Sequence, residues 1–161
     1  MFKIAFEKAY LIVIFSVLLI LSHLPFLFDK IVIKPNFMLI GVFCFTLTLN
    51  SNYSLLFIIF GLIQDYIDGV LVGISSLQYI LTSMLVENNR KAIEEQKFII
   101  IWAAFSIVTL ICYITKISIL SIFHKILLFN NQQVFEMLLT ISFYPVLTVL
   151  ITSSFNRLGI R

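Results

Sequence analysis

Residues 35–64 run PNFMLIGVFCFTLTLNSNYSLLFIIFGLIQ and carry no charged side chain. About 20 apolar residues cross the hydrocarbon core of a bilayer, so this run is too long for one untilted helix and short for two. Its middle holds Asn50, Ser51 and Asn52, whose residue types favour turns over helix interiors. We therefore expect two short helices, over residues 37–49 and 53–64, which either span the membrane or form a re-entrant pair.

Charge-free runs elsewhere predict four further spans, because a charged residue at a helix centre costs about 2.5–3.5 kcal/mol on insertion scales. They cover residues 9–28, 70–86, 98–115 and 137–156. The chain has 161 residues, is 61% hydrophobic and 12% charged, and has a mean hydropathy of +1.09. Soluble domains are about 25% charged, so these values exclude a soluble globule. They indicate an all-α polytopic membrane protein of about six transmembrane helices, with a single integral membrane domain over residues 1–161.

The basic residues predict an orientation, because cytoplasmic loops carry an excess of lysine and arginine. With six segments, the two chain ends and the loop at 87–97 share one side. That side holds seven basic residues, and the opposite side holds four: Lys30, Lys34, Lys116 and Lys125. We therefore expect both termini in the cytoplasm. An unbroken helix over residues 35–64 would instead predict an N-terminus outside.

Two polar segments each allow two structures. Residues 87–97 form either a loop or an extension of the preceding helix. Residues 117–129 place their polar side chains at spacings that suit one face of a helix along the outer membrane interface. A frayed end of the fifth span is equally consistent with that segment.

No motif points to an enzyme. The sequence lacks H-E-x-x-H, G-x-S-x-G and a Gly-rich phosphate loop. Cys44 and Cys112 lie in apolar runs, as packing cysteines do, and neither His23 nor His124 has a second ligand at metal-binding spacing. The excess of 11 basic over 8 acidic residues is too small to suggest nucleic acid as a partner. We expect no catalytic residue, no metal and no cofactor.

The strongest candidate site lies in residues 61–73, GLIQDYIDGVLVG. Gly61, Asp65, Gly69 and Gly73 are four residues apart, so neighbours in this series share a helix face. Small residues let helix backbones approach closely in lipid. Because a carboxylate at mid-bilayer is costly, we expect Asp65 near the outer end of the third span, with the glycines turning into the fourth.

Two interpretations of this acidic stripe remain open. In one, Asp65 caps or pairs within the bundle and holds an interface shape, with Lys116 or Lys125 as its partner. In the other, the stripe is a polar helix end followed by a glycine turn. Asp68 adds a second acid, to which we assign no role.

The spacing G-x-x-x-D-x-x-x-G-x-x-x-G resembles the central signature of the MreD family, small membrane proteins of the bacterial rod-shape system. The Pro35-Asn36 pair, which opens an apolar helix, adds to a resemblance that covers residues 35–86, whereas Asp68 departs from the family pattern. The resemblance implies a non-enzymatic scaffold in the bacterial cytoplasmic (inner) membrane. Such a scaffold links cytoplasmic MreB filaments and MreC to peptidoglycan synthesis by RodA and its penicillin-binding-protein partner. It also implies a structural or interaction motif made of Gly61, Asp65, Gly69, Gly73, Pro35 and Asn36.

The family fold is also similar to the six-helix substrate-binding subunit of energy-coupling-factor vitamin transporters, which makes a transporter subunit the alternative function. Such a subunit needs a cavity with convergent polar groups. The spans offer few of these groups, and most can bond to their own helix backbone: Gln78, Thr82, Ser83, Ser106, Thr109 and Thr148.

Overall fold

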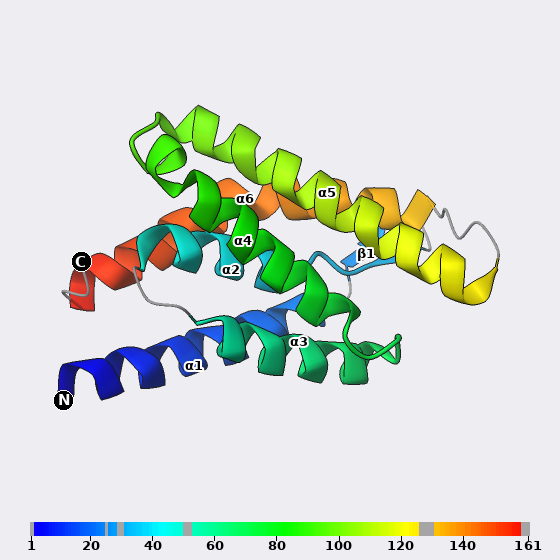
Figure 1. The fold of residues 1–161 in the computed structure, drawn as a ribbon, viewed down its shortest axis with the longest axis horizontal. Coiled ribbons are helices and arrows are strands. Elements are labelled where there is room, and N and C mark those ends of the chain that lie inside the picture. The colour runs from blue at the N-terminus through cyan, green and yellow to red at the C-terminus, as the bar shows by residue number, and fades with distance from the viewer. Residues whose placement is uncertain (1, 25, 29–30, 50–52, 126–130, 159–161) are drawn as a thin grey trace.

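The computed structural model describes residues 2–24, 26–28, 31–49, 53–125 and 131–158. Within these ranges the chain forms six helices and one two-stranded sheet (Figure 1). The elements in chain order are α1 (Phe2–Ser22), β1 (Phe26–Phe28), β2 (Ile31–Ile33), α2 (Phe37–Thr48), α3 (Ser54–Asp68), α4 (Ile74–Glu94), α5 (Phe98–His124) and α6 (Asn131–Leu158). The six helices confirm the all-helical class predicted from the sequence.

Two of the described helices are long and apolar enough to cross a membrane. These stretches are Phe98–Phe123 in α5 and Asn131–Ser154 in α6. Shorter apolar helices cover Ala9–Ser22 and Phe37–Thr48. The 12 residues of α2 and the 15 of α3 extend only about 18 and 23 Å at ~1.5 Å per residue, less than the ~30 Å hydrocarbon core.

The helices stack in three layers, with α2 and α4 between the α1/α3 pair and the α5/α6 pair (Figure 1). α2 is the most enclosed helix, since its residues from Phe37 to Leu47 are all buried. Phe43 of α2 packs edge-on against Phe105 of α5 and Tyr144 of α6, with ring centroids 5.2 and 5.7 Å apart. Such aromatic contacts fix the middle layer against the α5/α6 layer.

The run at 35–64 forms two helices and not one, as its polar triplet predicts. α2 is followed by Leu49 in an extended conformation, and α3 begins at Ser54, while residues 50–52 lie outside the described part of the chain. The first residues of α1, the α4–α5 connection and the last turns of α6 lie at one end of the bundle (Figure 1). The two ends of the chain lie at the same end of the bundle when the number of segments between them is even. The orientation of the bundle in the membrane stays a prediction.

The predicted end of the first span, at residue 28, is wrong. α1 ends at Ser22, and Phe26–Phe28 pairs antiparallel with Ile31–Ile33, Phe26 opposite Ile33. The sequence has a proline at position 25, which lacks the N–H that a continuing helix requires. The proline thus accounts for the end of the helix, and the apolar residues after it form the hairpin.

Three other predicted boundaries also need correction. The fourth helix begins at Ile74 instead of residue 70. It continues to Glu94, and of the two structures left open for residues 87–97 most of the segment therefore adopts the helix extension. α5 continues as one helix to His124, where Lys125 adopts a left-handed conformation (φ 53°), so the described part of 117–129 is neither a separate interfacial helix nor a frayed end. α6 begins at Asn131 and not at residue 137. Hydropathy misses the extended ends because polar residues continue a helix beyond its apolar run, and it places the start of α4 too early because the apolar residues 70–72 lie in the turn before the helix.

Candidate functional site

Asp65 lies in the last turn of α3 and its side chain is fully buried. Its carboxylate accepts hydrogen bonds from two backbone N–H groups at the start of α4: Gly73 to Oδ2 at 2.7 Å, and Ser75 to Oδ1 at 3.0 Å. The first N–H groups of a helix have no partner inside the helix, and the helix dipole favours a negative charge there. Asp65 therefore caps α4 from α3 and closes the turn between the two helices.

This geometry corrects the expected charge partner of Asp65. Lys116 and Lys125 were the expected partners by sequence, but the acceptors of Asp65 are occupied by the N–H groups of Gly73 and Ser75. Hydrogen bonds from the N–H groups of a helix start are charge-assisted and stabilise the ionised carboxylate directly. The geometry contains parts of both open interpretations: Asp65 caps within the bundle, and the helix end that carries it is followed by a turn with two glycines of positive φ.

Gly61 lies where α3 and α4 come closest. A Cβ atom on Gly61 would lie 2.5 Å from both the backbone N and the Cα of Ser76, far inside van der Waals contact. Across the same contact, the Ser76 hydroxyl donates to the Ile58 carbonyl at 3.0 Å. The absence of a side chain at Gly61 thus allows the two backbones to touch, as small residues do in membrane helix pairs.

Gly69 and Gly73 serve the turn and not the helix contact. Both have positive φ, 65° and 106°, and a Cβ at either position would have no neighbour within 4 Å. The Gly69 N–H donates to the Asp65 carbonyl as the cap of α3. The left-handed region is the reason for glycine at these two positions, because residues with a Cβ adopt it only at a cost.

Asn36 joins α2 to α4 and α6. Its side-chain oxygen accepts from the Leu39 N–H at 3.1 Å as the N-cap of α2, and from the Tyr79 hydroxyl at 3.2 Å. Its backbone N–H donates to the Thr140 hydroxyl at 3.0 Å. The Tyr79 hydroxyl also bonds to Oε1 of Gln64 on α3, so this buried network ties four helices together.

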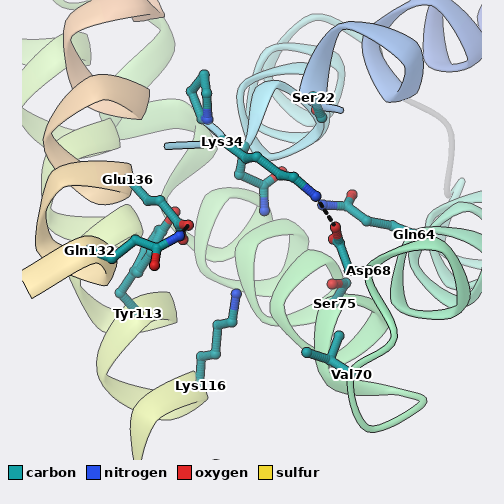
Figure 2. A pocket seen from close by; sticks show the side chains of 12 residues that line it. Ser22, Lys34, Gln64, Asp68, Val70, Ser75, Tyr113, Lys116, Gln132 and Glu136 are labelled. Carbon is teal, nitrogen blue, oxygen red and sulfur yellow. Dashed lines mark hydrogen bonds and ion pairs between the residues drawn. The ribbon is translucent and has the colours of Figure 1, made fainter. Parts of the chain in front are cut away.

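A polar cavity of about 280 Å³ opens next to this network (Figure 2). Four charged side chains contribute to its wall: Lys34, Asp68, Lys116 and Glu136. The rest of the wall is mostly neutral and polar, and consists of Ser22, Pro35, Asn36, Gln64, Val70, Ser75, Tyr113 and Gln132. We call this space the polar cavity; it lies at the end of the bundle where α3 turns into α4.

The charges of the polar cavity fall into two groups. On one side, Asp68 Oδ1 lies 3.5 Å from Lys34 Nζ and 3.5 Å from His23 Nε2. On the other side, Glu136 accepts a long hydrogen bond from Gln132 (3.4 Å) and interacts electrostatically with Lys116. Figure 2 shows Lys116 extending into the space between Glu136 and Asp68.

Sequence reasoning missed this convergence of polar groups. It correctly predicts that Thr82, Ser83, Ser106, Thr109 and Thr148 bond to carbonyls of their own helices. The cavity is built instead from residues at helix ends and beside the hairpin, far apart in the chain. One feature of the sequence could have indicated the cavity: charged residues such as Lys34 and Lys116 flank the predicted spans. A charge at the end of a membrane helix marks a candidate site.

Both cysteines are free and buried in the described bundle. Cys44 Sγ lies 3.5 Å from the Thr148 hydroxyl, and Cys112 Sγ lies 3.3 Å from that of Thr82. Each thiol thus packs against a neighbouring helix. Within the part of the chain that the structure describes, no three His, Cys, Asp or Glu side chains are grouped as a metal site would require.

The sequence was compared with profiles of known protein families, and one family matches most of the chain. The family profile described as rod shape-determining protein MreD matches residues 3–154. The chain belongs to the MreD family. MreD proteins are non-enzymatic proteins of rod-shape determination, so this member is a membrane protein with a role in bacterial cell shape. No curated protein and no solved structure matches the chain in the same comparisons.

Proposed function

We propose that this MreD family member is a membrane scaffold of the elongation machinery. It would link cytoplasmic MreB filaments and MreC to peptidoglycan synthesis by RodA and its penicillin-binding-protein partner. The observation that carries this proposal is the family match over residues 3–154, nearly the whole chain. The buried Asp65 adds to it, since a carboxylate bound by two backbone N–H groups at a helix start suits a structural role better than a chemical one.

The α3–α4 turn is the part of the fold best suited to meet a partner. Asp65 and the close contact at Gly61 hold the turn to one shape. Large side chains beside them point outward: Tyr66 is 84% exposed and Val72 is 70% exposed. A rigid turn with an exposed aromatic residue offers contact area at low entropic cost, as binding surfaces require.

We further propose that the chain lies in the bacterial inner membrane with both termini in the cytoplasm. Seven basic residues on the side of the termini against four on the other support this orientation. It would place the polar cavity and the α3–α4 turn at the periplasmic side, within reach of a periplasmic partner such as MreC.

Co-purification from a rod-shaped host tests the scaffold. The tagged wild-type chain should recover MreC and RodA, and Tyr66→Ala should lower that recovery severalfold at unchanged membrane level. Leu55→Ala is the matched control, because Leu55 is 71% exposed at the opposite end of the same helix. If the wild-type chain recovered none of MreC, MreB and RodA, the proposed scaffold function would be wrong.

A transporter subunit is the second candidate, and the polar cavity is the observation that favours it. Membrane subunits that bind vitamins require a cavity of this kind. Uptake of a vitamin-like solute that depends on this chain, together with a co-purifying pair of ATPases, would replace the scaffold by this alternative.

A further inference from the structure

Lys116 and Glu136 carry opposite charges and both line the polar cavity, but no ion pair joins them. Lys34 is neutralised by Asp68, with their charged atoms 3.5 Å apart. Among the described residues Lys116 forms no ion pair. Its ammonium lies 5.9 Å from the ring centroid of Tyr113, and its interaction with Glu136 acts across the cavity. The cavity therefore presents an ammonium on α5 and a carboxylate on α6 that interact at a distance but form no direct ion pair with each other.

A ligand with complementary charges would stabilise this separation of the two groups. Charged side chains at the level of a membrane helix are costly, and they normally pair with one another or line a polar space. Lys116 and Glu136 belong to helices that pack side by side, yet their charged groups are held apart with the cavity between them. A molecule with one negative and one positive group could bind both residues at once, its negative group at Lys116 and its positive group at Glu136.

We propose that the polar cavity binds a small zwitterion with an anionic group on Lys116 and a primary ammonium on Glu136. The anionic group is a phosphate or a carboxylate. Two sources share this chemistry: the headgroup of phosphatidylethanolamine, and a free amino-acid-like solute. The proposal is independent of the scaffold function, because a scaffold needs no ligand.

The dimensions and the remaining wall suit such a ligand. A volume of about 280 Å³ lies just below the ~300 Å³ at which pockets for drug-sized molecules begin, so a headgroup or an amino acid is the fitting size. The Tyr113 and Gln132 side chains lie beside Glu136 and supply hydrogen-bonding groups near the ammonium site (Figure 2). The paired Lys34 and Asp68 on the opposite wall add no net charge, which keeps the cavity as a whole neutral.

Binding is measured on the purified full chain, in detergent with equal amounts of the two lipids for the lipid source and in nanodiscs of phosphatidylcholine for the soluble source. For the lipid source, native mass spectrometry counts retained phosphatidylethanolamine against phosphatidylcholine, whose quaternary ammonium cannot donate a hydrogen bond to Glu136. For the soluble source, calorimetric titration uses phosphoethanolamine and alanine. Selective retention of phosphatidylethanolamine assigns the lipid, and saturable binding of either solute without lipid retention assigns the solute.

Charge removal tests the two contacts separately. Lys116→Gln and Glu136→Gln should each weaken binding about tenfold or more, as the loss of a hydrogen bond between charged groups does. The matched controls are Lys97→Gln and Glu95→Gln, which remove the same charges from exposed positions at the opposite end of the bundle and should bind as wild type. Val70→Phe, which narrows the cavity without removing a charge, should also reduce binding.

Unfolding temperatures of ligand-free variants separate a lost contact from a lost fold. The proposal is overturned if no zwitterion binds the wild-type chain. It is equally overturned if phosphatidylcholine is retained as well as phosphatidylethanolamine, or if folded Lys116→Gln and Glu136→Gln chains bind as tightly as wild type.

Discussion

The Gly73 N–H lies 2.7 Å from Oδ2 of Asp65, so a single buried carboxylate closes the turn between α3 and α4. The Ser75 N–H occupies the other oxygen. Removal of one partner from a buried hydrogen bond costs more than the bond contributes on average, because the remaining group is left without water or partner. The turn should therefore be sensitive to small chemical changes at Asp65.

Asp65→Asn should lower stability while leaving insertion intact. The amide keeps one acceptor but places an NH₂ group against an N–H donor, at a cost of about 1–3 kcal/mol. For a chain of this size that predicts an unfolding temperature lower by roughly 2–12 °C in detergent. Asp65→Ala should lower it further and reduce membrane abundance, and both variants should co-purify less MreC.

Asp68→Asn is the control for the change at Asp65. It removes the same charge three residues away, where the side chain is 26% exposed and pairs with Lys34 at 3.5 Å. Partly exposed ion pairs contribute little, so its unfolding temperature should stay near wild type. If Asp65→Asn were as stable as Asp68→Asn, the cap would have no structural importance.

Gly61→Ala should be disruptive although alanine is the better helix former. The added methyl group would overlap the backbone of Ser76, which cannot move without separating α3 from α4. Gly41→Ala is the matched comparison, because the nearest atom to its Cβ, also at 2.5 Å, is the end of the Leu18 side chain and not a backbone atom. Fluorescence-detected gel filtration after heating should rank Gly61→Ala well below Gly41→Ala, and the reverse order would contradict the backbone contact.

Substitutions at Gly69 should follow conformation and not size. A Cβ there has open space, but φ is 65°. Asn tolerates this region, whereas a branched side chain costs more than the ~1–2 kcal/mol of an ordinary residue. Folded membrane levels should therefore fall for Gly69→Val and stay near wild type for Gly69→Asn. Equal levels for the two variants would show that the turn does not require the left-handed conformation.

Cysteine labelling tests the orientation. In a chain with Cys44→Ala and Cys112→Ala, an impermeant maleimide should react in intact cells with Val72→Cys on the outer side. Asn89→Cys, which is exposed near the α4–α5 connection, should react only after the cells are permeabilised. Labelling of Asn89→Cys in intact cells would invert the proposed topology.

Much of the fold follows from the sequence, because charge-free runs and the triplet at 50–52 mark where helices lie and where they are interrupted. The hairpin does not follow. The proline at position 25 predicts a helix end, but composition does not reveal that the apolar residues 26–28 and 31–33 after it pair as strands. Hydropathy also does not predict helix ends such as Glu94, since polar residues extend a helix beyond its apolar segment.

The candidate site was predictable only in its local part. The spacing of Gly61, Asp65 and Gly69 marks a helix end and a turn, but it does not reveal that backbone N–H groups occupy the carboxylate. The polar cavity depends on contacts between distant segments. Lys116 and Glu136 are brought to one space by the pairing of α5 and α6, which no local pattern encodes.

The enclosure of α2 has a consequence for genetic screens. Because its residues from Phe37 to Leu47 face other helices of the same chain, neither lipid nor another protein reaches them in the folded molecule. Loss-of-function alleles in α2 should therefore be rescued by second-site changes within this chain, such as at Phe105 or Tyr144, and not by changes in another gene. Allele-specific suppressors in other genes should cluster on the outward faces of the remaining helices.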